Sequence, residues 1–230
     1  MTTHPIPVEV WSDVVCPWCY IGARRLAGGI AELRDDDPAP PPVEVVWRSF
    51  QLSPDAPTGD GGPVVDHLMA TKGLGREQVQ QMMAHIEGIA AGEGLRYDLS
   101  GARHTDTRLA HRALHEARHQ GHQAALVERL FRAQHCERAT IGTIGDLAAL
   151  GAEAGLDADA LVAALEGGAH EAAVDADLAR AAQIGVRGVP FAVVDGRYGI
   201  SGAQPAAVYA EALRRAAADR NPTGAAGAPS

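Results

Sequence analysis

The segment SDVVCPWCYIG, from Ser12 to Gly22, carries two cysteines separated only by a proline and a tryptophan. The residues from Val8 to Val14 alternate and are rich in β-branched side chains, which predicts a strand. A helical pattern follows, and Pro17 falls at the first helical position, where its missing N–H costs nothing. The chain is therefore expected to turn sharply from a strand into a helix at Cys16.

The position of the cysteine pair at the start of a helix favours thiol chemistry. Free backbone N–H groups and the helix dipole stabilise an anion there, so Cys16 is expected to ionise readily. Cys19, one turn later and more enclosed, suits the resolving role, in which it attacks a mixed disulfide and releases the partner. Asp13 is expected either to order or cap the helix entry, or to relay a proton and tune the thiolate together with Pro17. Trp18 is expected to cover the pair or to offer substrates an apolar contact.

Other uses of a cysteine pair fit this pattern less well. A zinc site needs about four ligands, and a single CxxC has no second pair to complete one. A permanent disulfide across two residues closes too small a loop to stabilise a fold much. The third cysteine, Cys136, follows a helical stretch and is expected to be a free, unreactive thiol. A thiol pair that turns over is the favoured interpretation.

The composition of the 230-residue chain narrows its possible partners. Hydrophobic residues make up 46% and charged residues 21%, as in ordinary soluble globular proteins. The formal net charge of −9 argues against nucleic acid and against an anionic membrane surface. The N-terminus shows no signal-peptide pattern, and no apolar segment is long enough to span a bilayer. The expected location is the cytoplasm, where three cysteines do not build a disulfide scaffold.

The order of the remaining elements matches a known fold. Val43 to Phe50 is a second strand, which completes a strand–helix–strand unit. Much later, a helix from His170 to Gln183 precedes two short strands, Phe191 to Val194 and Arg197 to Ile200, joined by an Asp-Gly hairpin turn. A final helix opens at Pro205. With the middle helices set aside, the order β-α-β and then α-β-β-α is that of the thioredoxin fold, in the α/β class.

The predicted organisation is a discontinuous thioredoxin-like domain interrupted by a helical domain. Residues 1–60 and 168–220 form the thioredoxin-like part, and residues 61–167 form an all-helical insertion. Gly28 and Gly29 are expected to weaken the first helix, because glycine is a poor helix former. Residues 221–230 are expected to be a disordered tail.

One helix of the insertion, expected from Thr105 to Gly121, carries the zinc-protease pattern HExxH at His115 to His119. The chemistry of that motif needs a helix that faces a cleft and a third ligand. The apolar face of this helix is formed by alanines and a leucine, which predicts that His111, His115 and His119 lie in solvent on the opposite side. A catalytic zinc is therefore not expected, and no metal site is predicted.

Five blocks, in order, resemble the FrnE-like branch of the DsbA family: CPWCY, WRSFQLSP, TDTRLAHRALHEA, LFRA and GVRGVPFAVVDGRYGISGAQ. The resemblance extends from residue 8 to about residue 218 and implies a thioredoxin fold with an inserted helical domain. It implies dithiol–disulfide oxidoreductase or isomerase activity, with Cys16 as nucleophile and Cys19 as resolving thiol. It also implies that Pro190 is a cis-proline facing the pair, with Val189 offering backbone hydrogen bonds to a peptide substrate.

The expected function is exchange between the CPWC dithiol and protein or peptide disulfides. The exchange requires no metal or organic cofactor, and glutathione or a thioredoxin system is the expected partner that resets the pair. Since Cys136 is the only other cysteine, any mechanism that needs a second cysteine pair is excluded. The Pro-Trp between the cysteines differs from the Pro-His of periplasmic DsbA, so an equally oxidising potential is not implied.

Two other functions remain open on the same scaffold. One is a glutathione-dependent isomerase or transferase that acts on a small aromatic or polyketide-like compound. Such relatives bind the glutathione thiol at the helix N-terminus and typically lack the paired cysteines. The other is a peptide-binding adaptor, whose binding would survive replacement of both cysteines by serine.

Overall fold

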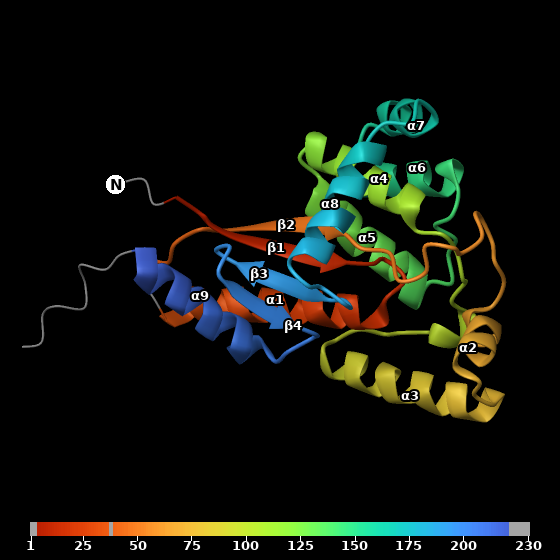
Figure 1. Cartoon of the computed structure of the whole chain (residues 1–230), viewed down its shortest axis with the longest axis horizontal. Helices are drawn as coiled ribbons and strands as arrows, with labels where there is room; N and C mark the ends of the chain where they lie inside the picture. The colour runs from red at the N-terminus through yellow and green to blue at the C-terminus, as the bar shows by residue number, and fades with distance from the viewer. Residues whose placement is uncertain (1–3, 37–38, 221–230) are drawn as a thin grey trace, which may run out of the picture.

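A four-stranded mixed sheet lies at the centre of the computed structural model, which describes residues 4–36 and 39–220. β1 pairs in parallel with β2 and antiparallel with β3, and β3 pairs antiparallel with β4. This arrangement is the sheet of a thioredoxin fold, so the predicted fold class is confirmed. The strands, in their spatial order, are β2 (Val43–Ser49), β1 (Ile6–Ser12), β3 (Phe191–Val194) and β4 (Tyr198–Ser201) (Figure 1).

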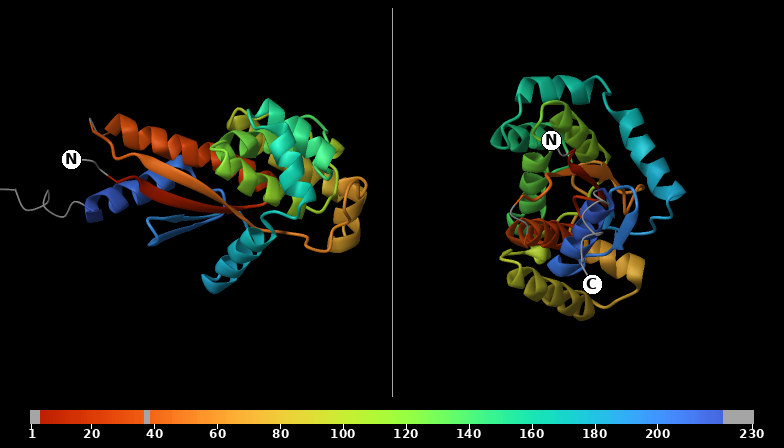
Figure 2. Two further views of the ribbon diagram at one scale, coloured as in Figure 1. Left: turned by 90° about the horizontal axis from the view of Figure 1, so that it is seen from above. Right: turned by 90° about the vertical axis from the view of Figure 1, so that its left-hand side faces the viewer.

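Helices cover both faces of this sheet. Val8 of β1 is buried in a cluster with Leu26 of α1 and Leu213 of α9, so these two helices share one face. Trp11 points the other way, where it packs against Ala181 of α8. The sheet therefore lies between α1 and α8, as Figure 2 shows. The bounds of these helices are α1 (Pro17–Asp36), α8 (Glu171–Gln183) and α9 (Ala206–Arg220).

The two adjacent glycines of α1 do not break the helix, which runs unbroken from Pro17 to Asp36. They lie where α9 crosses α1. A Cβ at Gly29 would stand 2.6 Å from Cβ of Tyr209 and 2.7 Å from the carbonyl oxygen of Ala206. The glycines therefore allow two helix backbones to approach closely, and this contact offsets their low helix propensity.

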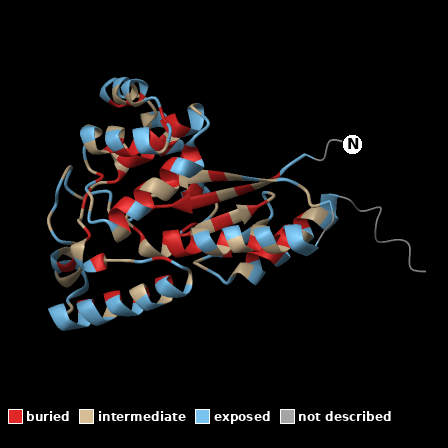
Figure 3. Ribbon diagram, turned by 180° about the vertical axis from the view of Figure 1, so that it is seen from behind, coloured by how far each residue is buried: buried red, intermediate tan, exposed pale blue. Residues whose placement is uncertain are grey.

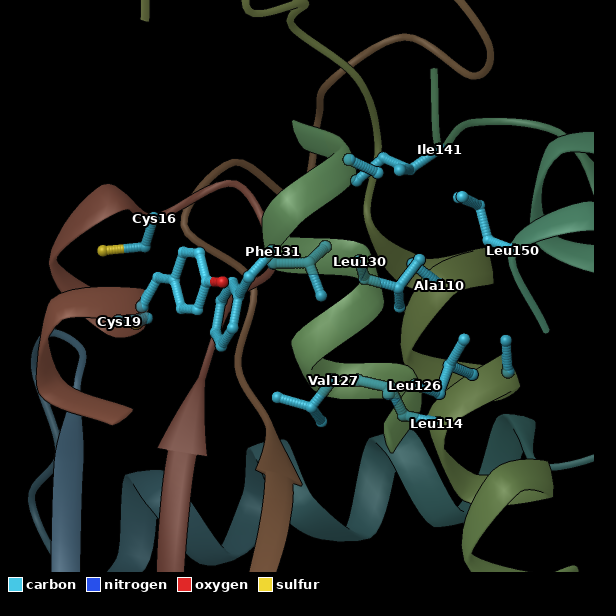
Figure 4. Packing of buried hydrophobic residues seen from close by; sticks show 14 of the residues in the cluster. Cys16, Cys19, Ala110, Leu114, Leu126, Val127, Leu130, Phe131, Ile141 and Leu150 are labelled. Atoms are coloured by element: carbon cyan, nitrogen blue, oxygen red, sulfur yellow. The ribbon is translucent and has the colours of Figure 1, made fainter. Parts of the chain in front are cut away.

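Between β2 and α8 the chain forms six α-helices and a short 3₁₀ helix, which surround the end of the sheet where β1 stops (Figure 1). A single hydrophobic cluster contains Cys16 and Cys19 together with Leu126, Leu130 and Phe131 of α5 (Figure 4). Figure 3 shows the buried residues continuing from the sheet into these helices. The elements are α2 (Val64–Lys72), α3 (Arg76–Gly92), η1 (Leu99–Gly101), α4 (Arg108–His119), α5 (Gln123–Cys136), α6 (Ile144–Glu153) and α7 (Ala158–Glu166).

The ends of several elements differ from the sequence prediction. β1 ends at Ser12 rather than at residue 14, because the backbone turns and Cys16 N–H donates to the carbonyl of Asp13 at 3.0 Å. α4 does not begin with Thr105 as its cap. Asp106 Oδ1 instead accepts from the N–H of Arg108 at 2.9 Å, and the helix starts there. β4 lies one residue later than predicted, at 198–201.

The predicted tail, residues 221–230, lies outside the described residues. None of the helices formed by residues 4–36 and 39–220 combines the length and apolar character needed to cross a bilayer.

Candidate active site

The strand-to-helix turn places the two cysteines at the end of the sheet that faces the insertion. Cys16 immediately precedes α1 and is 4% exposed, whereas Cys19 lies in the first turn and is fully buried. The N–H of Cys19 donates to the carbonyl of Cys16 at 3.0 Å. In Figure 4 the Cys16 sulfur is directed away from Phe131. Both thiols are therefore buried, and Cys16 is the slightly more exposed of the two.

The segment before β3 reaches the cysteine pair from the far end of the sequence. The Val189–Pro190 peptide bond is cis, and Pro190 is buried. The thiol of Cys16 donates to the carbonyl oxygen of Val189, with 3.7 Å between sulfur and oxygen. On the next turn of α1, a Cβ at Gly22 would stand 2.9 Å from Cγ of Pro190. The absence of a side chain at Gly22 therefore lets the active-site helix sit directly against this proline.

The surroundings of Cys19 favour the protonated form of its thiol. Burial raises the pKa of the Cys19 thiol well above its ordinary value, and the neighbouring Cys16 raises it further. The Ser12 hydroxyl and the backbone of Asp13 lie beside the thiol and act in the opposite direction without overcoming burial. Cys19 is consequently a protonated thiol near neutral pH, and it must lose a proton before it can act as a nucleophile.

Asp13 is fully buried and shapes the entry to the active-site helix. Its Oδ2 accepts from the N–H of Leu52 at 2.8 Å, which ties the loop after β2 to the cysteine turn. Its Oδ1 has no hydrogen-bond partner and lies 3.5 Å from Nε2 of His111. The carboxylate therefore does not cap α1; the Asp13 carbonyl, which accepts from Cys16, orders the entry instead.

Aromatic side chains support the CPWC turn from the insertion side. Trp18 is partly buried and packs against the cluster that contains both cysteines. Tyr20 stacks on Phe131 with 5.1 Å between ring centroids. The hydroxyl of Tyr97 donates to the carbonyl of Pro17 at 2.7 Å. Sequence reasoning missed Tyr97, because nothing local to it indicates a contact with a residue eighty positions earlier.

The histidines of the HExxH helix do not form the predicted solvent-facing stripe. His111 is 1% exposed, and the side chain of His115 is 11% exposed, whereas that of His119 is 81% exposed. The prediction is wrong for the first two because α5, α7 and α8 all pack against α4. His115 Nε2 instead lies 3.1 Å from Oδ2 of Asp177, which anchors α4 to α8. No three His, Cys, Asp or Glu side chains within residues 4–36 and 39–220 are placed to hold a metal ion.

Cys136 is the last residue of α5 and is partly exposed. Burial raises the pKa of its thiol, and the charge of Glu137 acts in the same direction. Both effects disfavour the reactive thiolate. These surroundings differ from those of Cys16, which stands at a helix N-terminus rather than at a C-terminus.

The chain is similar to several solved structures. A crystal structure described as a probable DsbA oxidoreductase, SCO1869 from Streptomyces coelicolor, is 37% identical, with a TM-score of 0.85 over 98% of this chain and 95% of that one. The cytosolic disulfide reductase DsbM from Pseudomonas aeruginosa, solved with GSH, is 22% identical, with a TM-score of 0.59 over 91% and 99%. A 2-hydroxychromene-2-carboxylate isomerase is 16% identical, with a TM-score of 0.65 over 95% and 100%. The last two likenesses show the shared fold.

The similarity to one protein family extends along almost the whole sequence. Residues 7–214 match the DSBA-like thioredoxin domain, a span that includes the cysteine turn, the helical insertion and the cis-proline segment. The chain belongs to the family of DSBA-like thioredoxin domains.

Proposed function

We propose that this protein is a dithiol–disulfide oxidoreductase or isomerase that exchanges with disulfides of proteins or peptides. The observation that carries the proposal is the hydrogen bond from the Cys16 thiol to the carbonyl oxygen of Val189. The sulfur and the oxygen are 3.7 Å apart, beside the cis peptide bond to Pro190. A substrate sulfur that approaches Cys16 also meets this backbone. The partly exposed side chains of Trp18 and Val189 add apolar surface next to it.

The exchange proceeds in two balanced steps. The Cys16 thiolate attacks one sulfur of a substrate disulfide, and the other substrate sulfur leaves as a thiolate. Cys19, once deprotonated, then attacks the sulfur of Cys16, forms the Cys16–Cys19 disulfide and releases the second substrate thiolate. Two electrons pass to the substrate, and glutathione or a thioredoxin system supplies two electrons to reset the pair. The reverse sequence oxidises a substrate dithiol, and a slow second step allows isomerisation.

We place this exchange in the cytoplasm and assign the protein to the FrnE-like branch of its family. The sequence blocks around CPWC support the branch, and the use of only three cysteines supports the compartment. The similarity in fold to a reductase described as cytosolic and solved with GSH is consistent with glutathione as the partner that resets the pair.

A redox titration tests the proposal. The purified protein is equilibrated in glutathione buffers of graded potential while tryptophan fluorescence is followed, since Trp18 lies between the cysteines. We expect one two-electron transition, with a midpoint between about −270 mV and about −120 mV, the values of thioredoxin and DsbA. Cys136→Ser should keep the transition and Cys16→Ser should lose it. A flat response from the unmodified protein would contradict the proposal.

The alternative function is a glutathione-dependent isomerase or transferase that acts on a small aromatic compound. The observation that favours this candidate is the fold that the chain shares with the 2-hydroxychromene-2-carboxylate isomerase. It predicts turnover that needs glutathione but survives Cys19→Ser, because a bound glutathione thiol would take the place of the pair. The buried position of Cys19 directly against Cys16 favours exchange instead.

A further inference from the structure

A surface cavity of about 360 Å³ lies between α3 and the segment that follows it. After α3 the chain turns and runs back alongside the helix toward η1 (Figure 1). The walls include Met83, Ala84 and Glu87 of α3, and Tyr97 and Asp98 of the returning segment. We call this cavity the α3 pocket. Its volume is at the lower end of the range for ligand pockets, so it has room for one long side chain rather than for a large cofactor.

The α3 pocket is next to the cysteine turn, because Tyr97 belongs to both. The hydroxyl of Tyr97 donates to the carbonyl of Pro17 at 2.7 Å, and the same residue lines the pocket. Burial raises the pKa of Tyr97 above its ordinary value, and the charges of nearby groups, Cys16 and Cys19 among them, act in the same direction. The pocket is thus separated from the turn by one tyrosine side chain.

The two carboxylates of the pocket differ in their partners. Asp98 Oδ2 accepts from Nε of Arg138 at 2.6 Å, and the two side chains form an ion pair. Glu87 Oε1 accepts from the N–H of Leu99 at 2.8 Å, but Glu87 forms no ion pair with any Lys, Arg or His within residues 4–36 and 39–220. Glu87 is also half-buried. Its charge is therefore available to a cation that enters the pocket.

The other walls of the pocket suit the stem of a basic side chain. Met83 and Tyr97 supply apolar and aromatic surface, and Ala84 is small and exposed. Lysine and arginine carry their charge at the end of a long apolar stem, and arginine also stacks on aromatic rings. Glu87 would repel an acidic side chain. A purely apolar one would cover the carboxylate without giving it a partner, which costs free energy.

We propose that the α3 pocket binds a lysine or arginine side chain of the protein or peptide whose disulfide reacts with Cys16. This inference rests on the proposed function and adds a preference among its substrates. An extended peptide advances by about 3.3–3.6 Å per residue, so a side chain three positions from the substrate cysteine starts about 10–11 Å away from it. That span is long enough to pass one tyrosine side chain and reach the pocket.

The experiment compares peptides that differ in one charge. Each peptide carries a single cysteine as a mixed disulfide with thionitrobenzoate, and either arginine or its neutral isostere citrulline three positions before or after that cysteine. In a Cys136→Ser background, the Cys16 thiolate bonds to the peptide sulfur, the mixed disulfide breaks, and coloured thionitrobenzoate leaves because its thiol has the lower pKa. Stopped-flow absorbance gives the second-order rate constant for each peptide.

We expect the arginine peptide to react about tenfold faster than the citrulline peptide at one of the two spacings, the lower end of the effect of a hydrogen bond between charged groups. Glu87→Gln should abolish the difference, since glutamine still accepts from the N–H of Leu99 but has no charge. Ala84→Leu should abolish it too, because the larger side chain takes up part of the cavity. Glu77→Gln, an exposed position in the first turn of α3 outside the pocket, should keep the preference.

Two results would overturn the inference while leaving the proposed function intact. One is equal rates for the arginine and citrulline peptides at both spacings in the parent protein. The other is a preference for arginine that a folded Glu87→Gln variant reduces no more than Glu77→Gln does, which long-range attraction to a chain of net charge −9 predicts. No release of thionitrobenzoate from any peptide would contradict the proposed function itself.

Discussion

Gly29→Ala is expected to destabilise the protein by about 3 kcal/mol, at the upper end of the usual cost of overpacking. The added methyl group would stand 2.6 Å from Cβ of Tyr209, 2.7 Å from the carbonyl oxygen of Ala206 and 2.9 Å from the N atom of Ala210. Two of these atoms belong to the backbone of α9, so no side-chain rotation relieves the overlap. α9 must move away from α1, and this loosens the hydrophobic cluster to which Leu213 of α9 and Leu26 of α1 both belong.

Gly88→Ala is the matched control for this substitution. Gly88 lies inside α3, four residues before its last residue, is exposed, and has no heavy atom within 4 Å of the position a Cβ would take. Alanine should therefore stabilise the protein there by about 0.5–1 kcal/mol through helix propensity alone. Denaturant unfolding of both variants measures the two changes, and a Gly29→Ala variant as stable as the parent would refute the close contact of α1 with α9.

Asp177→Asn is expected to cost about 3 kcal/mol, the lower end of the range for breaking a buried ion pair. Asp177 is 4% exposed and its carboxylate connects α8 to β2 and α4. Its Oδ2 accepts from the N–H of Ser49 at 2.9 Å and lies 3.1 Å from His115 Nε2, and its Oδ1 lies 3.2 Å from Nη1 of Arg48. The asparagine keeps the size of the side chain but removes the buried negative charge, and Arg48 is then left with Glu9 as its ion-pair partner.

The effect of Asp177 should depend on pH. Burial alone would raise the pKa of its carboxyl group, but His115, the Ser49 N–H and Arg48 outweigh burial and hold the pKa below its ordinary value. The stabilisation is therefore complete above about pH 4, the ordinary pKa of Asp, and is lost as the pH falls through the lower folded-state pKa. The difference in unfolding free energy between the parent and Asp177→Asn should narrow over that acidic range.

Asp175→Asn provides the comparison on the same helix. The Asp175 side chain is 63% exposed and pairs with Arg108 at the surface. Exposed ion pairs contribute about 0–1 kcal/mol, so this variant should stay close to the parent at every pH. Equal losses for Asp175→Asn and Asp177→Asn would show that α8 is not anchored through its buried carboxylate.

The fold could be predicted from the sequence because its signals are local. The alternation in β1, Pro17 after Cys16 and the Asp-Gly turn between β3 and β4 each involve residues that are close along the chain. Together they fix the order of elements, and the order suffices to choose the thioredoxin fold. The CPWC pair follows the same logic, since its chemistry depends on the strand-to-helix turn that contains it.

The features that sequence reasoning missed all depend on contacts between distant residues. A helical pattern predicts one buried face, but α4 is covered from several sides. On the face predicted to be polar, His111 is therefore buried and His115 is only partly exposed. In the sequence, Gly29 appears only as a poor helix former within a helix. Its role becomes visible in the structure, where α9, about 180 residues later, packs against it. In the sequence, Asp177 resembles an ordinary charged residue of a surface helix. Only the folded structure brings Arg48 of β2 and His115 of α4 against its carboxylate.

The pairing of β1 has a consequence for how the protein is made. β1 is an inner strand, with β2 on one side and β3 on the other, and β3 begins only at Phe191. Synthesis runs from the N-terminus, so Cys16 and Cys19 leave the ribosome long before Pro190 does. The nascent chain therefore presents two thiols without the segment that faces them. The candidate site is completed only when most of the polypeptide has been translated, and a truncated translation product has the cysteines without the segment that contains Pro190.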